Sequence, residues 1–328
     1  MRALVIEKQP FFHLPVMAAQ AVDWIAPSPE GRYVDATAGL GGHTLALLQA
    51  GAGYVLALDR DAYALDRAQE RIEQAGLLSR TIFVHARYRN LANILVELGW
   101  GKVQGVLLDA GVSSMQLDDP GRGFSFAHGG PLDMRMDKEE RKGAADVVNT
   151  ASEQELIKIL REYGQEPMAG RIARHIVMER QKSRIETTDH LAGVVKRAYP
   201  RQRRARSRNH PATKTFQALR IAVNQELDDL QSVINALPDI LVPGGRAVVI
   251  AFHSLEDRIV KHTLRRLAKG CLCPPEQPVC TCEPIPRIKI LTKKPLLPGL
   301  EEMQGNPRSR SAKMRVAQAL GAKGATDE

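Results

Sequence analysis

The chain has 328 residues, of which 44% are hydrophobic and 25% charged, a composition typical of a globular protein with one large domain or two smaller ones. Its 46 lysines and arginines outnumber its 37 acidic residues, and the net charge of +9 favours a polyanionic partner without requiring one. The longest strongly apolar run, Ala247 to Phe252, is too short to cross a membrane, and no signal peptide is evident. We therefore expect a cytoplasmic protein that does not contact a membrane.

Short apolar segments alternate with helical segments along the first 110 residues. Strands are predicted at 33–35, 54–59, 81–85 and 105–109, with helices at 44–50, 61–75 and 91–98. Alternation at this spacing is typical of a parallel sheet with right-handed crossovers. Ligands of such sheets bind at the carboxyl ends of the strands, where Asp35, Asp59 and Asp109 fall.

The pattern changes between about Ser113 and Pro211, where we find no convincing strand. Ser152 and Glu155 have the spacing of a capping box, which predicts the start of a helix. A long amphipathic helix over roughly 213–237 then returns the chain to the α/β pattern. Further elements are predicted as a strand at 246–252, a helix at 255–269 and two strand-like segments at 288–291 and 314–317. We predict a Rossmann-like, doubly wound α/β domain formed by 1–112 and 212–328, with 113–211 as an inserted all-helical domain.

A glycine-rich turn follows the first strand, with the sequence Gly39-Leu40-Gly41-Gly42-His43-Thr44. Such a turn lets backbone amides approach a ligand at the start of a helix. The carboxylate of Asp59, at the end of the next strand, is well placed for the ribose hydroxyls of NAD or S-adenosylmethionine. Thr44 occupies the position of the third glycine of the dinucleotide fingerprint, which favours S-adenosylmethionine. The alternative is a set of ordinary turns and strand-end acids that bind no cofactor.

The chain carries an ordered series of motifs that can be compared with a known family. They are His13-Leu14-Pro15-Val16, 35–43, Asp59-Arg60-Asp61, 107–114, Gln116-Leu117-Asp118, 122–126, 130–136, 210–218 and 252–258. The series closely resembles the bacterial 16S rRNA cytosine-N4 methyltransferases, from about residue 13 to about residue 316. The resemblance implies an S-adenosylmethionine-dependent class I methyltransferase with an inserted substrate-recognition domain. It also implies that the substrate is a decoding-centre cytosine of 16S rRNA in the small ribosomal subunit.

The resemblance also implies which residues contact the cofactor. These are Gly41, Gly42, His43, Asp59, Tyr88, Asp109 and Gln116. The two glycines would admit the methionine moiety, Asp59 would bind the ribose, and Tyr88 would pack on the adenine. Two of the residues have simpler interpretations, because His43 could merely begin a helix and Gln116 could be a solvated loop residue.

The sequence offers two candidates for the catalytic residue. Many amino-methyltransferases have Asp or Asn followed by two prolines and an aromatic residue at the end of the fourth strand, whereas this chain has Asp109-Ala110-Gly111. We take Asp109 as the hypothesis for contact with the target amine, since an acceptor there would localise the lone pair and receive the proton. His253 is a second candidate, with helix capping as its alternative.

Two groups of basic residues are candidate RNA contacts. Seven lysines and arginines lie within the thirteen residues from Lys196 to Arg208. Arg258, Lys261, Arg265 and Lys269 share one face of the last predicted helix. Both groups could bind phosphates or simply be solvated surface.

The cysteines are confined to one short segment, at 271, 273, 280 and 282. Cys271, Cys273, Cys280 and Cys282 could hold a structural zinc, but paired spacings of one residue are unusual, so we favour reduced thiols or reversible disulfides and assign no metal ligand. The sequence leaves a homodimer open. Competing functions are a dinucleotide-dependent oxidoreductase and a non-catalytic RNA-binding factor.

Overall fold

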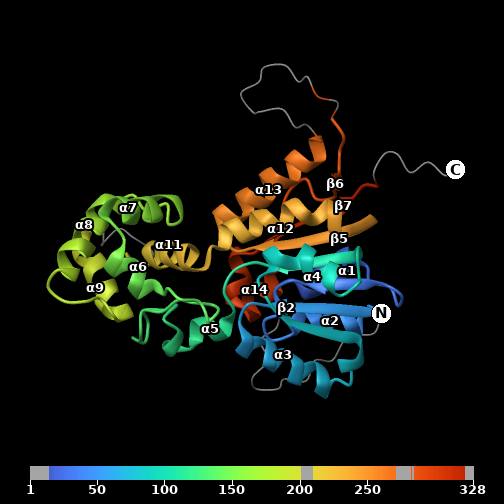
Figure 1. The fold of residues 1–328 in the computed structure, drawn as a ribbon, viewed down its shortest axis with the longest axis horizontal. Coiled ribbons are helices and arrows are strands. Elements are labelled where there is room, and N and C mark those ends of the chain that lie inside the picture. Colours follow the sequence, from blue (N-terminus) through green and yellow to red (C-terminus); the bar gives the residue numbers. More distant parts are fainter. Residues whose placement is uncertain (1–14, 201–209, 271–281, 283, 322–328) are drawn as a thin grey trace. The chain divides into compact units, whose positions relative to one another are not determined.

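The computed structural model describes residues 15–200, 210–270, 282 and 284–321, and the chain divides into two compact units (Figure 1). Residues 1–110 and 229–328 form the first, here called the sheet unit. Gly111–Asp228 form the second, here called the middle unit because it lies in the middle of the chain.

Among the described residues of the sheet unit, seven strands form one sheet in the order β3-β2-β1-β4-β5-β7-β6. Strands β1 to β5 are parallel to their neighbours, whereas β7 is antiparallel to β5 and to β6. Their bounds are β1 Arg32–Asp35, β2 Tyr54–Asp59, β3 Thr81–His85, β4 Val103–Asp109, β5 Leu241–Ala251, β6 Ile288–Ile290 and β7 Lys313–Ala319. The strand order reverses between β1 and β4, which is the place where ligands bind in open α/β sheets.

Helices cover both faces of this sheet, and alternate residues of each strand supply the two cores. One core joins Val34, Val106 and Val249 to α4 (Leu91–Glu97), α12 (Glu226–Ile240) and α13 (Ser254–Lys269). The other joins Tyr33, Leu107 and Val248 to α1 (Ala18–Ile25), α2 (Gly42–Gln49) and α3 (Ala62–Gln74). Short helices complete the unit: η1 (Leu78–Arg80), η2 (Tyr88–Asn90), α14 (Leu300–Gly305) and η4 (Pro307–Ser311). The predicted doubly wound α/β fold is confirmed.

The middle unit has its own hydrophobic core, which includes Leu156, Ile172, Ile176 and Leu219. Its helices are α5 (Ser114–Asp118), η3 (Pro120–Arg122), α6 (Ala144–Thr150), α7 (Glu153–Glu162), α8 (Ala169–Arg180), α9 (Thr188–Ala198) and α11 (Thr213–Asn224). Among its described residues, β-pairing is limited to one isolated bridge, between Pro131 and Thr187. In neither unit do the described residues contain a helix that is both long and apolar enough to cross a membrane.

Two predicted elements differ from the structure. The long helix expected at 213–237 is two helices, because Gln225 adopts a left-handed conformation (φ 52°) that ends α11 before α12 begins. The fifth strand begins at Leu241 instead of 246, so that Pro243-Gly244-Gly245, a sequence typical of a tight turn, lies inside β5, where its register against β4 shifts. A tight turn and a strand irregularity use the same residue types, which explains the second error.

Candidate active site

Three aspartates lie at the carboxyl ends of neighbouring strands in the sheet unit. Asp59 ends β2, Asp35 ends β1 and Asp109 ends β4, and these strands are adjacent in the order β2-β1-β4. The structure therefore brings together the three acids that the sequence singled out. Their surroundings differ, and so do the roles that each can play.

Asp35 is fully buried and holds the glycine-rich turn in place. Its carboxylate accepts a hydrogen bond from the hydroxyl of Thr44 (2.7 Å) on α2 and one from the backbone N–H of Thr37 (3.2 Å). Burial raises the pKa of Asp35, and the nearby His43 and the two hydrogen bonds oppose that rise in part. With no exposed surface left for a ligand, Asp35 is a structural residue of the turn.

The two predicted glycine contacts have packing reasons to be glycine. Gly41 has a φ of 74°, and a Cβ there would lie 3.1 Å from the Cβ of Ala68 on α3. A Cβ on Gly42 would lie 3.0 Å from the ring of Pro15. The turn can therefore approach α3 and the segment at Pro15 closely only because these two side chains are absent.

Asp59 is partly buried, and backbone N–H groups orient its carboxylate. Gly39 donates to one oxygen (2.7 Å) and Asp61 donates to the other (2.8 Å). Burial outweighs these hydrogen bonds and raises the pKa of Asp59 to about 6. Each oxygen retains a lone pair, so a fixed carboxylate of this kind can accept the two vicinal hydroxyls of a ribose.

Asp109 faces His43 across the point where the strand order reverses. Its backbone N–H donates to the hydroxyl of Thr37 (2.7 Å), and its Oδ2 lies 3.4 Å from Nε2 of His43. That separation is an electrostatic contact without hydrogen-bond geometry, since neither ring nitrogen of the buried His43 has a hydrogen-bond partner in the described part of the chain. Oδ1 of Asp109 is also buried without a partner there. Buried polar atoms rarely stay unpaired, so the pair fits a ligand that brings its own polar groups.

The charge state of His43 depends on the acids around it. Burial lowers its pKa, but the carboxylates of Asp109 and Asp35 raise it by more, and the net pKa lies above the ordinary value. His43 is the second residue of α2, so it does sit at a helix start, yet it is also 96% buried beside Asp109. His43 therefore lies at a helix start, as one interpretation of the sequence had it, and its place beside Asp109 is also compatible with the other, a cofactor contact.

Tyr88 and Gln116 lie in different units. Tyr88 begins η2, three residues after the end of β3, and its partly buried ring packs against the first core of the sheet unit. Gln116 lies in α5 of the middle unit, where its side chain accepts from the N–H of Ser113 (3.1 Å) in a capping box. Because Gln116 is buried, its interpretation as a solvated loop residue is wrong.

His253 caps helix α13. Its Nδ1 accepts from the N–H of Glu256 (3.3 Å), and its Nε2 lies 3.1 Å from a carboxylate oxygen of the same residue. Glu256 in turn accepts from the N–H groups of Phe252 (2.7 Å) and His253 (3.1 Å). This reciprocal arrangement confirms the helix-capping interpretation of His253.

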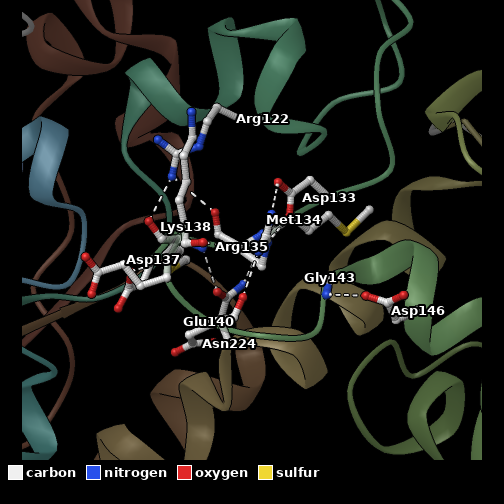
Figure 2. Close-up of polar contacts among 12 residues, drawn as sticks. Arg122, Asp133, Met134, Arg135, Asp137, Lys138, Glu140, Gly143, Asp146 and Asn224 are labelled. Carbon is white, nitrogen blue, oxygen red and sulfur yellow. Dashed lines mark hydrogen bonds and ion pairs between the residues drawn. The ribbon is translucent and has the colours of Figure 1, made fainter.

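A buried polar network fixes the motif at 130–136 in the middle unit (Figure 2). The side chain of Asn224 accepts from the N–H of Met136 (2.9 Å) and donates to the carbonyl of Met134 (2.7 Å). Arg122 donates to the carbonyl of Met136 (2.8 Å) from the other side. These bonds hold Met134 at a positive φ of 61° inside the unit's core. The sequence drew attention to this motif only through the family resemblance.

The residues of the sheet unit fit S-adenosylmethionine. Asp59 is a fixed acceptor for ribose hydroxyls, and the unpaired Oδ1 of Asp109 is an acceptor for a donor such as an ammonium group. Thr37 was not among the predicted site residues, although its hydroxyl holds the backbone of Asp109. The sequence signal that could have indicated Thr37 is its place between a strand-end acid and the glycine turn.

Comparison with known proteins identifies the family. The model of the MraW methylase family matches residues 10–320, and the chain belongs to that family. A protein of Solidesulfovibrio magneticus named ribosomal RNA small subunit methyltransferase H is 51% identical over 318 residues, which cover 96% of this chain and 97% of that protein. A protein of Heliobacterium modesticaldum with the same name is 47% identical over 313 residues, which cover 94% of this chain and 99% of its own. The chain is a methyltransferase, and S-adenosylmethionine is its methyl donor.

Solved structures resemble the chain only distantly. A structure described as a rRNA-methylase from Clostridium thermocellum aligns over 94% of this chain and 99% of its own, with a TM-score of 0.44 and 10% identity. That similarity is too weak to add to the family assignment. Of the predicted zinc candidates, Cys271, Cys273 and Cys280 lie outside the described residues and Cys282 is partly buried, so their state stays a prediction.

Proposed function

We propose that this enzyme methylates the N4 amine of a decoding-centre cytosine in 16S rRNA of the small ribosomal subunit. The observation that carries the proposal is the identity of about half the residues, over nearly the whole chain, with proteins named ribosomal RNA small subunit methyltransferase H. The ordered motifs of the sequence support the choice of cytosine and of its exocyclic nitrogen.

The reaction needs help from the protein because the N4 lone pair is delocalised into the cytosine ring. S-adenosylmethionine supplies an electrophilic methyl group. Asp109 accepts a hydrogen bond from the amine, which localises the lone pair, and its carboxylate receives the proton released when the N–C bond forms. Thr37 fixes the backbone of Asp109, and His43 faces its carboxylate, so that the acceptor is positioned before the substrate binds.

The other predicted cofactor residues have separate roles in this proposal. Asp59 binds the ribose hydroxyls through a carboxylate that Gly39 and Asp61 already orient. Gly41 and Gly42 permit the tight turn, and Tyr88 packs on the adenine. Gln116 stays a predicted cofactor contact.

We further propose that the inserted segment 113–211 recognises the RNA. It carries the basic run from Lys196 to Arg208, of which Lys196 and Arg197 are exposed at the end of α9 and residues 201–209 lie outside the described part. A target base must leave its stack to reach the methyl donor, so contacts to the surrounding phosphates would hold the RNA during that step.

A methyl-transfer assay tests the proposal. Purified enzyme and S-adenosylmethionine labelled in the methyl group are incubated with small subunits from cells that lack the enzyme, and with large subunits as the control. Label should enter only the 16S rRNA and be recovered as N4-methylcytidine. Label in another nucleoside, or equal label in the large subunit, would rule the proposal out. Calorimetric binding of NAD in place of S-adenosylmethionine would favour the oxidoreductase instead.

A further inference from the structure

A basic pocket lies in the sheet unit, between α13 and the last two strands of the sheet. Its volume is about 370 Å³. Four cationic side chains and one hydroxyl line it, namely Lys261 and Arg265 of α13, Thr292 and Lys293 after β6, and Arg315 of β7. No acidic side chain lines it. We call this the α13 pocket.

Three of the four cations carry uncompensated charge. Arg315 donates to Asp257 (2.7 Å), which neutralises it, and Lys313 lies 3.8 Å from the same carboxylate. Lys261, Arg265 and Lys293 make no ion pair with any described acidic residue. Like charges gathered in one pocket repel each other, so the arrangement is stabilised when an anion binds.

Thr292 adds a neutral donor to the cations. Its side chain is 94% buried, and its hydroxyl oxygen accepts from the N–H of Val316 (2.9 Å). That bond uses the oxygen as an acceptor and leaves the hydroxyl proton for another partner. Cationic groups and a hydroxyl donor that converge on one space suit the several acceptor oxygens of a phosphate.

We propose that the α13 pocket binds a backbone phosphate of the RNA substrate. The inference rests on the proposed function for the identity of the RNA, but it concerns a contact that the function does not require. Cations continue outside the pocket, since Arg258 and Lys269 are exposed along α13 and Lys294 is exposed next to Lys293. Repeated phosphates of a strand match this extended surface, whereas a free phosphate or a nucleotide would use the pocket alone.

The test compares two double variants that remove the same charge. Lys261→Gln with Lys293→Gln changes the pocket. Lys102→Gln with Arg266→Gln is the control, because Lys102 is exposed and Arg266, beside Arg265 on α13, hydrogen-bonds to Asn235 and does not line the pocket. Affinity for small subunits from cells lacking the enzyme is measured at several salt concentrations, together with S-adenosylmethionine affinity and the melting temperature.

The pocket variant should bind small subunits about tenfold more weakly at fixed salt. Its log association constant should also fall less steeply with log salt concentration, with a slope smaller in magnitude by roughly one to two. The control should stay within about twofold of the wild type, and both variants should keep the wild-type cofactor affinity and melting temperature. Equal behaviour of the two variants would overturn the inference. The inference would also be overturned if the pocket variant bound inorganic phosphate or AMP more weakly than the wild type but kept the wild-type affinity for small subunits. Failure of the wild type to methylate small subunits would instead contradict the proposed function, because the pocket test measures binding.

Discussion

In the proposed function, Asp109 serves both cofactor binding and catalysis. Its backbone is tied to Thr37, one carboxylate oxygen faces His43, and the other is buried without a partner among the described residues. An acceptor held in this way loses little entropy when a substrate amine arrives, which is how positioning contributes to rate. The chain lacks the two prolines that often follow this acid in amino-methyltransferases; here Thr37 bonds to the backbone of Asp109 and His43 lies beside its carboxylate.

Replacing the carboxylate of Asp109 should separate chemistry from folding. Asp109→Asn keeps the size of the side chain but removes its charge and its ability to take a proton, so kcat should fall by about 10²-fold to 10⁴-fold. The measurement is single-turnover methyl transfer at saturating S-adenosylmethionine, with the cofactor dissociation constant measured in parallel. Full turnover by Asp109→Asn with normal cofactor binding would exclude Asp109 as the acceptor.

We expect Asp59 to make cofactor binding depend on pH. Its pKa is raised to about 6, and ribose hydroxyls bound to it would donate to its ionised form, so cofactor binding would favour loss of the proton. Affinity for S-adenosylmethionine should therefore be constant well above pH 6 and fall below it, to about a tenth at pH 5 of its value at pH 7. Isothermal titration over this range checks the expectation. Asp59→Asn serves as the control, since this variant should bind S-adenosylmethionine more weakly and without the pH dependence. If the variant kept the pH dependence of the wild type, another group would be responsible for it.

At the scale of single elements, the turn between β1 and α2 depends on Gly41. It combines a positive φ of 74° with close contact to Ala68. Gly76 has a similar φ of 69° but open space where a Cβ would lie, so it isolates the cost of the backbone conformation. Gly76→Ala should destabilise the protein by about 1 kcal/mol, whereas Gly41→Ala should cost roughly 2–4 kcal/mol and also weaken S-adenosylmethionine binding. Equal losses of unfolding free energy in the two variants would show that the contact with Ala68 can relax.

In the middle unit, Asn224 stabilises the arrangement of two neighbouring segments. It joins α11 to the motif at 130–136 through buried hydrogen bonds (Figure 2). Asn224→Ala would leave the N–H of Met136 and the carbonyl of Met134 without this partner, at a cost of about 2–4 kcal/mol in the free energy of unfolding. Denaturant unfolding measures the loss. Asn235→Ala, which removes only an exposed side-chain contact with Arg266, should change stability by less than about 0.5 kcal/mol.

The elements that the sequence predicts well are those with strong local signals. Strand β3 coincides with its predicted range, and α7 begins at the predicted capping box of Ser152 and Glu155. The sequence does not mark the break at Gln225. The neighbouring Asn224 hydrogen-bonds to residues about ninety positions earlier in the chain, and no local pattern reveals such contacts.

The same contrast holds for the site. The strand-end aspartates could be placed at one edge of the sheet because parallel strands end together. Their different roles could not, since burial alone separates the structural Asp35 from the ligand-accessible Asp59. The α13 pocket shows the limit most clearly: the sequence indicated the face of α13 with Lys261 and Arg265, but Lys293 and Arg315 join it only through the pairing of β6 with β7.

At the scale of the whole molecule, the family membership and the candidate site support one expected reaction, the methylation of ribosomal RNA. The chain is a methyltransferase of the MraW family, and the candidate acceptors for S-adenosylmethionine, Asp59 and Asp109, lie at the carboxyl ends of β2 and β4. Its surplus of positive charge suits a ribosomal RNA substrate. The central claim is therefore that it adds one methyl group to the N4 atom of a cytosine in 16S rRNA.

Mapping of methylated cytosines in 16S rRNA tests this claim most directly. Ribosomal RNA is compared, by nucleoside and fragment mass spectrometry, from cells with the gene, without it, and with the gene restored as wild type or as Asp109→Asn. One decoding-centre cytosine should carry an N4-methyl group in the first strain, lose it in the second, and regain it only with the wild-type gene. An unchanged 16S methylation pattern in the strain without the gene, or loss of a methyl group from a different atom, would contradict the proposed function.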